Sequence, residues 1–169
     1  MAVVPWIFAA LAIMAAGHAV AQDAAKPATF DERAFPHEVR KALRYAHDEC
    51  RRQGGKRVTF APNTVHKLDL TGDGRDDYIV DLRETECHDR PAVYCGTAGC
   101  TFDIIVTLKR GGHRNVFSQR VLNHEILPGA GAKTIRFMLH GGYCGLSGGS
   151  PCSKTHRITA RPFEFKQPK

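Results

Sequence analysis

Apolar residues between positions 35 and 50 recur at steps of three and four, the periodicity of a helix with one buried face. Pro36 suits a first helical turn and Gly54-Gly55 supplies the stop, so the pattern predicts a helix from about residue 36 to residue 53. Cys50 lies on the apolar face, where it can staple the helix to the sheet. The apolar stripe consists of Phe35, Val39, Ala42, Leu43, Ala46 and Cys50, and the other face carries Arg40, Lys41, Arg44, Asp48 and Glu49.

After Gly55 the pattern changes to short β-rich runs separated by glycine-rich turns. One helix followed by a series of strands predicts an α+β fold, with an N-terminal amphipathic helix packed on a mainly antiparallel β-sheet. The sequence shows no internal repeat and no second domain. The predicted strands span residues 57–61, 65–70, 78–82, 101–108, 115–122, 133–139, 155–160 and 162–165.

Residues 1–21 have the pattern of a signal peptide. The run 3–16 is almost wholly apolar, and Ala19-Val20-Ala21 provides small residues for cleavage. A retained membrane anchor is the competing interpretation, because no Lys or Arg precedes the run, but the run is short for a bilayer span. We therefore predict a periplasmic or secreted protein with no transmembrane span after cleavage. Its predicted parts are the signal peptide, a flexible leader at 22–33 and a single domain at 34–169.

The chain has a formal net charge of +7, and its basic residues recur along the whole sequence. Interspersed acidic residues favour a simple role in solubility, while contact with an anionic lipid, polysaccharide or nucleic acid is the alternative. No aromatic-rich RNA-binding signature and no recognition helix accompany the charge. We therefore expect no sequence-specific nucleic acid partner.

An even number of cysteines in a chain with a predicted signal peptide predicts disulfide bonds. A zinc site is a minor alternative, because the cysteine separations contain no CxxC pair. The six cysteines are Cys50, Cys87, Cys95, Cys100, Cys144 and Cys152.

The acidic loop at residues 69–77 has the spacing of a calcium-binding loop. Acidic or hydroxyl side chains occupy positions 1, 3, 5 and 9 of the loop, and a glycine at position 6 allows a sharp turn. The loop resembles those of EF-hands, dockerins and FG-GAP repeats, and its strand-like flanks make the strand-loop-strand site of FG-GAP repeats the closer analogue. The predicted ligands are the side chains of Asp69, Thr71, Asp73 and Asp77 and the backbone oxygen of Arg75.

Two departures weaken the calcium prediction. Thr71 stands where Asp or Asn is usual, and Val80 stands where an EF-hand has its bidentate glutamate. A plain hairpin turn, which favours Asp, Gly and Thr for their local hydrogen bonds, explains the same residues without a metal. If Ca²⁺ does bind, about three carboxylates predict only a weak structural site, with a dissociation constant of roughly 10⁻⁴–10⁻³ M.

Catalytic motifs give no convincing match, and we predict no enzyme. Residues 145–149 fit G-x-S-x-G, but Ser150-Pro151-Cys152 follows where a nucleophile elbow requires a helix. The histidines are numerous, yet none is paired with a cysteine or carboxylate at a spacing that predicts catalysis.

Three segments together resemble a group of small, uncharacterised secreted or periplasmic proteobacterial proteins. They are the Asp/Gly loop with Tyr78-Ile-Val-Asp81, Tyr94 with the CGxxGC motif at 95–100, and the run from Leu139 through Cys144 to Cys152. The resemblance covers roughly residues 50 to 160 and implies export and disulfides, but no activity. Within this framework Cys144–Cys152 is the favoured pairing because both cysteines lie in one glycine-rich excursion. Cys95–Cys100 and Cys50–Cys87 follow, with a crossed set of Cys87–Cys100 and Cys50–Cys95 as the alternative.

The sequence therefore supports two main hypotheses of function. The first is a non-enzymatic exported protein with one weak structural Ca²⁺ loop. The second is an envelope protein–protein interaction module, such as a hydrolase inhibitor, that presents the stapled 144–152 loop to its partner. Adhesion to anionic surfaces is a third and weaker possibility.

Overall fold

The computed structural model describes residues 30–147 and 149–168. The predicted signal peptide and most of the predicted leader lie outside these residues. Phe30, within the predicted leader, packs against the domain, since its ring lies 5.5 Å from that of Phe35 and 5.1 Å from that of Phe60. A short 3₁₀ helix, η1 (Glu32–Ala34), follows.

Helix α1 (His37–Arg52) forms where the apolar periodicity predicts it, and it begins directly after Pro36. Its stripe is buried: Val39, Leu43 and Ala46 are fully shielded from solvent, and Cys50 is 1 % exposed. The amphipathic pattern therefore fixes which side of α1 faces the sheet.

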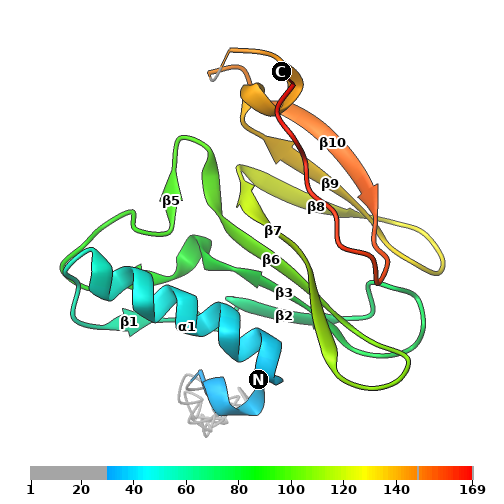
Figure 1. Cartoon of the computed structure of the whole chain (residues 1–169), viewed down its shortest axis with the longest axis horizontal. Helices are drawn as coiled ribbons and strands as arrows, with labels where there is room; N and C mark the ends of the chain where they lie inside the picture. Colours follow the sequence, from blue (N-terminus) through cyan, green and yellow to red (C-terminus); the bar gives the residue numbers. More distant parts are fainter. Residues whose placement is uncertain (1–29, 148, 169) are drawn as a thin grey trace, which may run out of the picture.

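The strands form two main sheets and a small ribbon, and every pair of strands is antiparallel (Figure 1). The first sheet has the order β2-β3-β6, with β7 and the short β5 both paired to β6, and the second has the order β8-β9-β10. The first sheet contains β2 (Val65–Leu68), β3 (Asp77–Asp81), β5 (Cys95–Gly96), β6 (Gly99–Thr107) and β7 (His113–Val121). The second contains β8 (Asn123–Leu127), β9 (Thr134–Leu139) and β10 (Cys152–Arg157), while β1 (Val58–Thr59) and β4 (Glu86–Cys87) form the ribbon. Two further 3₁₀ helices are η2 (Leu82–Glu84) and η3 (Gly141–Cys144).

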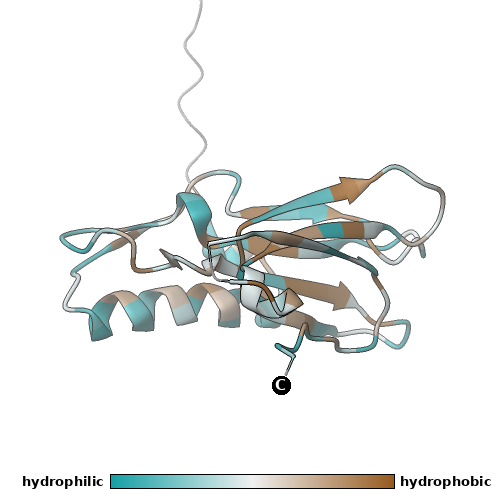
Figure 2. Ribbon diagram, turned by 90° about the horizontal axis from the view of Figure 1, so that it is seen from above, coloured by the Kyte–Doolittle hydropathy of each residue, from teal (hydrophilic) through white to brown (hydrophobic). Residues whose placement is uncertain are grey.

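The first sheet is the middle of three layers, with α1 on one face and the second sheet on the other (Figure 2). Strand alternation supplies both faces. In β3, Tyr78 and Val80 belong to the core beneath α1, whereas Ile79 belongs to the core between the sheets. Because both faces are covered, all five residues of β3 are buried.

The C-terminal segment differs from the prediction. Residues 162–165, predicted as a strand, form no strand and run as an extended strap along the open side of the core between the two sheets (Figure 1). The Phe163 amide donates to the Val116 backbone oxygen at 2.8 Å. At Phe165 the side chain of Gln119 takes the place of a partner strand, because its amide nitrogen donates to the Phe165 oxygen at 3.0 Å and its oxygen accepts from the Phe165 nitrogen at 2.8 Å. The stacked ring of Phe163 lies 4.7 Å from that of Phe117.

Other boundaries also moved. Strand β10 covers 152–157, not the predicted 155–160, and β8, β4 and β5 were not predicted as strands. Strand β8 follows β7 after a single residue, so the two form one uninterrupted β-rich run in the sequence, and no turn signal separates them.

The α+β prediction and the favoured disulfide pairing are confirmed. The bonds are Cys50–Cys87, Cys95–Cys100 and Cys144–Cys152. The first ties α1 to the small β1–β4 ribbon, so Cys50 staples the helix as predicted. Three disulfides are typical of a protein of an oxidising, extracytoplasmic compartment. Over residues 30–147 and 149–168, no helix is long and apolar enough to cross a membrane.

Candidate functional site

The Asp/Gly loop is held together by its own backbone amides. Asp69 accepts hydrogen bonds from the amides of Gly72, Asp73 and Gly74, at 2.7, 3.2 and 2.8 Å. These hydrogen bonds, that of Gly74 foremost, lower the pKa of Asp69.

Asp77 performs the same task at the other end of the loop. It is fully buried, and it accepts the amides of Leu70 and Thr71 at 2.9 Å each and that of Thr107 at 2.7 Å. Its carboxylate thereby fastens the loop to β6.

The remaining predicted ligands do not converge with these two carboxylates. Asp73 forms an ion pair with the guanidinium of Arg75. The Thr71 hydroxyl is shielded from solvent and has no hydrogen-bond partner among the described residues. Asp76, which is not among the predicted ligands, pairs with Lys67 at 2.9 Å.

In this arrangement the Asp69 and Asp77 carboxylates accept hydrogen bonds from backbone amides, as in a turn, and do not face a common cation. In the described part of the chain, no three His, Cys, Asp or Glu side chains come together in a group that could hold a metal ion. Calcium binding by the five predicted residues stays a prediction.

The stapled 144–152 loop folds back on η3. A side chain at Gly141 would collide with the backbone oxygens of Ser147 and Ser150, so this close approach requires glycine. The hydroxyl of Ser147 lies 3.2 Å from that of Ser150. Leu146 is 50 % exposed on the same loop.

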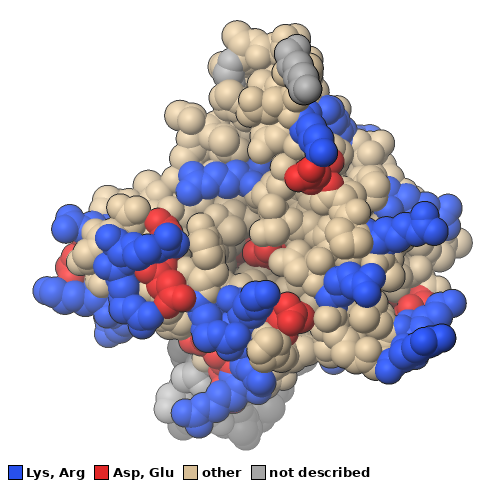
Figure 3. Space-filling model, viewed as in Figure 1, with Lys and Arg blue, Asp and Glu red and all other residues tan. Residues whose placement is uncertain are grey.

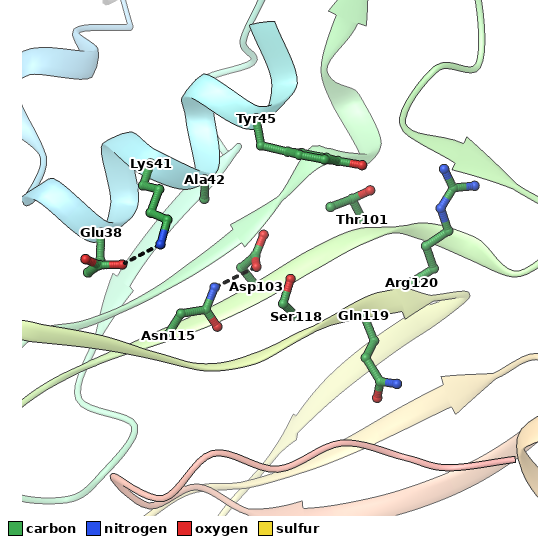
Figure 4. Close-up of a pocket in the computed structure, with 10 residues that line it drawn as sticks. All are labelled: Glu38, Lys41, Ala42, Tyr45, Thr101, Asp103, Asn115, Ser118, Gln119 and Arg120. Carbon is green, nitrogen blue, oxygen red and sulfur yellow. Dashed lines mark hydrogen bonds and ion pairs between the residues drawn. The ribbon is translucent and has the colours of Figure 1, made fainter. Parts of the chain in front are cut away.

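A polar cleft that the sequence reasoning did not identify lies between α1 and strands β6 and β7 (Figure 4). Its volume of about 460 Å³ falls within the range of small-molecule sites, roughly 300–1,000 Å³. Residues Glu38, Lys41, Ala42 and Tyr45 line it from the helix, and Thr101, Asp103, Asn115, Ser118, Arg120 and the backbone at Gln119 line it from the sheet.

Asp103 forms the floor of the cleft and is 5 % exposed. Burial raises the pKa of its carboxyl, and the hydrogen bonds from Ser118 and Asn115 offset only part of that effect. The Asn115 amide lies 2.8 Å from Asp103 Oδ1. A carboxyl in this environment can both donate and accept hydrogen bonds at a pH where an exposed aspartate only accepts.

A β-bulge assembles this floor. Strand β7 pairs Ser118 with Asp103 and Asn115 with Ile105, and the register shifts between these pairs. Val116 is therefore the extra residue, and the shift turns Asn115 and Ser118 to the same face although they are an odd number of positions apart. Val116 and Phe117 are in consequence both buried towards the second sheet.

The mouth of the cleft combines an aromatic ring with two cations. Tyr45 is 41 % exposed, and its ring lies over the cleft above Asp103 (Figure 4). Lys41, which is 4.0 Å from Glu38, and Arg120 stand on opposite sides of the opening (Figure 4). Gln119 points away from the cleft, towards the C-terminal strap.

The sequence held one signal for this site. Asp103 is a single carboxylate in the apolar run Phe102-Asp-Ile-Ile-Val106, and a buried charge without a structural partner is unusual. Its partners gave no signal, because strand periodicity would place Asn115 and Ser118 on opposite faces. Comparisons of the chain with family models, with curated proteins and with solved structures gave no match.

Proposed function

We propose that the protein is a non-catalytic binding protein of the periplasm or the extracellular space, and that its cleft takes a small hydroxylated acid. The observation that carries the proposal is the convergence of Asp103, Asn115 and Ser118 beneath the ring of Tyr45. Such a site offers paired donors and acceptors below and an apolar surface above, which suits a compact molecule with several hydroxyl groups.

The charges at the mouth favour an acidic ligand. Lys41 and Arg120 both border the opening, whereas Glu38 is the one acidic side chain at its rim among the residues that the structure describes. An anionic group placed between the two cations gains charge-assisted hydrogen bonds. A carboxyl at the floor whose pKa is raised repels such a ligand less than an ionised one.

A non-catalytic role is supported by how the polar groups are used. The Asp103 carboxyl already receives hydrogen bonds from Asn115 and Ser118, and Thr101 Oγ1 donates to the Tyr94 oxygen at 3.4 Å. The described residues that line the cleft include no histidine or cysteine to act as a base or nucleophile beside the carboxyl.

Calorimetric titration with glucuronate tests the proposal, with glucose and glucosamine as the neutral and cationic probes. We expect saturable binding of glucuronate at one site, weaker binding of glucose and no binding of glucosamine. Tyr45→Ala and Arg120→Gln should each weaken glucuronate binding at least about tenfold, which corresponds to about 1.4 kcal/mol.

Met138→Ala is the matched control, because Met138 is 42 % exposed but lies on β9, outside the cleft. Equal binding by wild-type protein and all three variants would reject the cleft as the site. Equal binding of the three sugars would reject an acidic ligand.

A second candidate function is docking of a protein partner on the stapled loop. Leu146, exposed on a loop closed by Cys144–Cys152, supports this candidate because a rigid apolar anchor loses little entropy on binding. Pull-down with the wild-type protein and with Leu146→Ser tests it. A partner that both proteins recover equally would rule out this loop.

Calcium binding by residues 69–77 is proposed as a structural role: the ion would stabilise the fold and would not take part in binding at the cleft. The observation that supports calcium binding is the Thr71 hydroxyl, which is shielded from solvent and has no hydrogen-bond partner among the described residues. Calorimetric titration after chelator treatment should give about one ion per chain, and Asp73→Ala should abolish any Ca²⁺-dependent rise in Tm. The absence of heat would leave the loop as an ordinary turn.

A further inference from the structure

Five exposed cations gather at the end of the molecule where β6 turns into β7 and where β10 ends, and we call this surface the basic end. Figure 3 shows Lys and Arg side chains along the right-hand side, where these elements lie in Figure 1. The basic end consists of Lys109, Arg110, Arg114, Arg157 and Arg161.

Contacts between segments hold these cations near one another. Arg114 Nη1 donates to the Ala160 oxygen at 3.1 Å, which places β7 beside the segment that carries Arg161. Arg157 and Arg161 border one shallow hollow of about 620 Å³, together with His156 and Phe163. The ring of His156 stacks on that of Phe163 at 3.6 Å, so the wall of the hollow is firmly packed.

The five cations form no ion pair with any other described residue. The acidic residues of the nearby Asp/Gly loop are already engaged, since Asp73 pairs with Arg75, Asp76 pairs with Lys67, and Asp69 accepts amides. The positive charge of the basic end is therefore uncompensated within the described chain.

The cations at the end of α1 behave differently. Arg51 pairs with Asp48 at 2.5 Å, and Arg52 pairs with Glu49. The exposure of an arginine is therefore not enough to identify a binding surface in this protein. The cations of the basic end differ from those at the end of α1 because they form no ion pairs with described residues.

We propose that the basic end binds an acidic polysaccharide. Its five cations lie on two adjoining segments, 109–114 and 157–161, which suits an extended polymer with repeated anionic groups. Guanidinium groups bind carboxylate, sulfate and phosphate bidentately. A bilayer surface fits less well, because the exposed large apolar residues of the described chain, Tyr45, Met138 and Leu146, lie on other elements and would not insert beside these charges.

Titration with polygalacturonate in a series of salt concentrations tests this inference. We expect binding that weakens as salt increases, because the polymer displaces counterions. Arg157→Gln with Arg161→Gln should weaken binding at low salt by about tenfold or more and make the logarithmic salt dependence shallower by about two. Arg51→Gln with Arg52→Gln removes the same net charge at the C-terminal end of α1 and should leave polygalacturonate binding close to that of the wild type.

Equal losses in the two double variants would show an effect of net charge alone and overturn the proposal, as would no binding of polygalacturonate at low salt. Tighter binding to vesicles of phosphatidylglycerol than to the polymer, lost in Arg157→Gln with Arg161→Gln, would overturn it in favour of a lipid surface. The cleft variant Tyr45→Ala should bind the polymer like wild type, so the result does not depend on the small ligand.

Discussion

Asn115 donates a hydrogen bond of 2.8 Å to the buried carboxyl of Asp103 from the near side of a β-bulge. Ser118 reaches the same carboxyl from the far side of the bulge. One irregularity in β7 therefore brings three polar side chains together on the face of the sheet that α1 packs against, at the floor of the cleft.

The raised pKa of Asp103 makes a prediction about stability and pH. Between the ordinary value of 3.8 and the higher pKa in the folded protein, the folded state holds this proton while the unfolded state has lost it. The contribution of Asp103 is therefore fully favourable below 3.8 and declines as pH rises towards the folded pKa. Asp103→Asn removes this decline.

Urea denaturation of both proteins between pH 3.5 and 7 measures the effect. We expect the free energy of unfolding of Asp103→Asn, relative to wild type, to increase with pH. Asp48→Asn, at an exposed position on α1, is the control and should show no such trend. Two parallel pH curves for wild type and Asp103→Asn would contradict the raised pKa.

Asp77 should be far more important for stability than its neighbour in sequence. Asp77→Asn replaces an acceptor oxygen with an amide donor that faces backbone N–H groups. We expect this change to lower the free energy of unfolding by about 3 kcal/mol. Asp76→Asn removes only an exposed pair with Lys67 and should cost less than about 1 kcal/mol. Urea unfolding of the two variants compares them directly, and similar midpoints would show that the amides near residue 77 find other partners.

The side chain of Gln119 holds the C-terminal strap at Phe165, while the Phe163 amide donates to the Val116 oxygen at 2.8 Å, so Gln119→Ala should loosen the strap at Phe165. Loss of two hydrogen bonds to Phe165 predicts a destabilisation of about 2 kcal/mol. Hydrogen exchange of the Phe165 amide should accelerate more than that of the β6 amides. Gln53→Ala is the control, because Gln53 is an exposed glutamine whose side chain is hydrogen-bonded to Glu49; it should leave exchange at Phe165 unchanged. Unchanged exchange at Phe165 would mean that the aromatic contacts and the Phe163–Val116 backbone bond suffice to hold the strap.

The Cys50–Cys87 bond closes 37 residues, whereas Cys95–Cys100 closes only 5. Chain entropy then predicts a loss of about 4 kcal/mol when the first pair is replaced by alanine and about 2 kcal/mol for the second. Thermal and urea unfolding of the two double variants test the order. The reverse order would show that native-state contacts outweigh the entropy of the unfolded chain.

Local patterns in the sequence determined most of the scaffold. The helix followed from its 3.6-residue periodicity, and the antiparallel sheet followed from alternating runs between glycine-rich turns. The pairing of Cys144 with Cys152 followed from their position in one short excursion. Each of these features depends on neighbours within a few residues or on simple loop closure.

The cleft depends instead on register, which no local pattern contains. The bulge at Val116 changes which side chains of β7 share a face of the sheet. The alternation of apolar and polar residues along the strand does not predict that change. Residues 162–165 looked like a strand for a related reason. Their alternation is real, but Phe163 and Phe165 pack against the two sheets, and a glutamine side chain occupies the place of a partner strand.

The strap also has a consequence for the order of synthesis. Phe163 and Phe165 pack into the core between the two sheets, yet they follow every strand that forms it. A nascent chain can therefore build the layer beneath α1 early, while the second apolar layer stays open until these two rings have emerged. Closure of this layer therefore waits for the last residues of the chain, so the two sheets can still move apart until synthesis is almost complete.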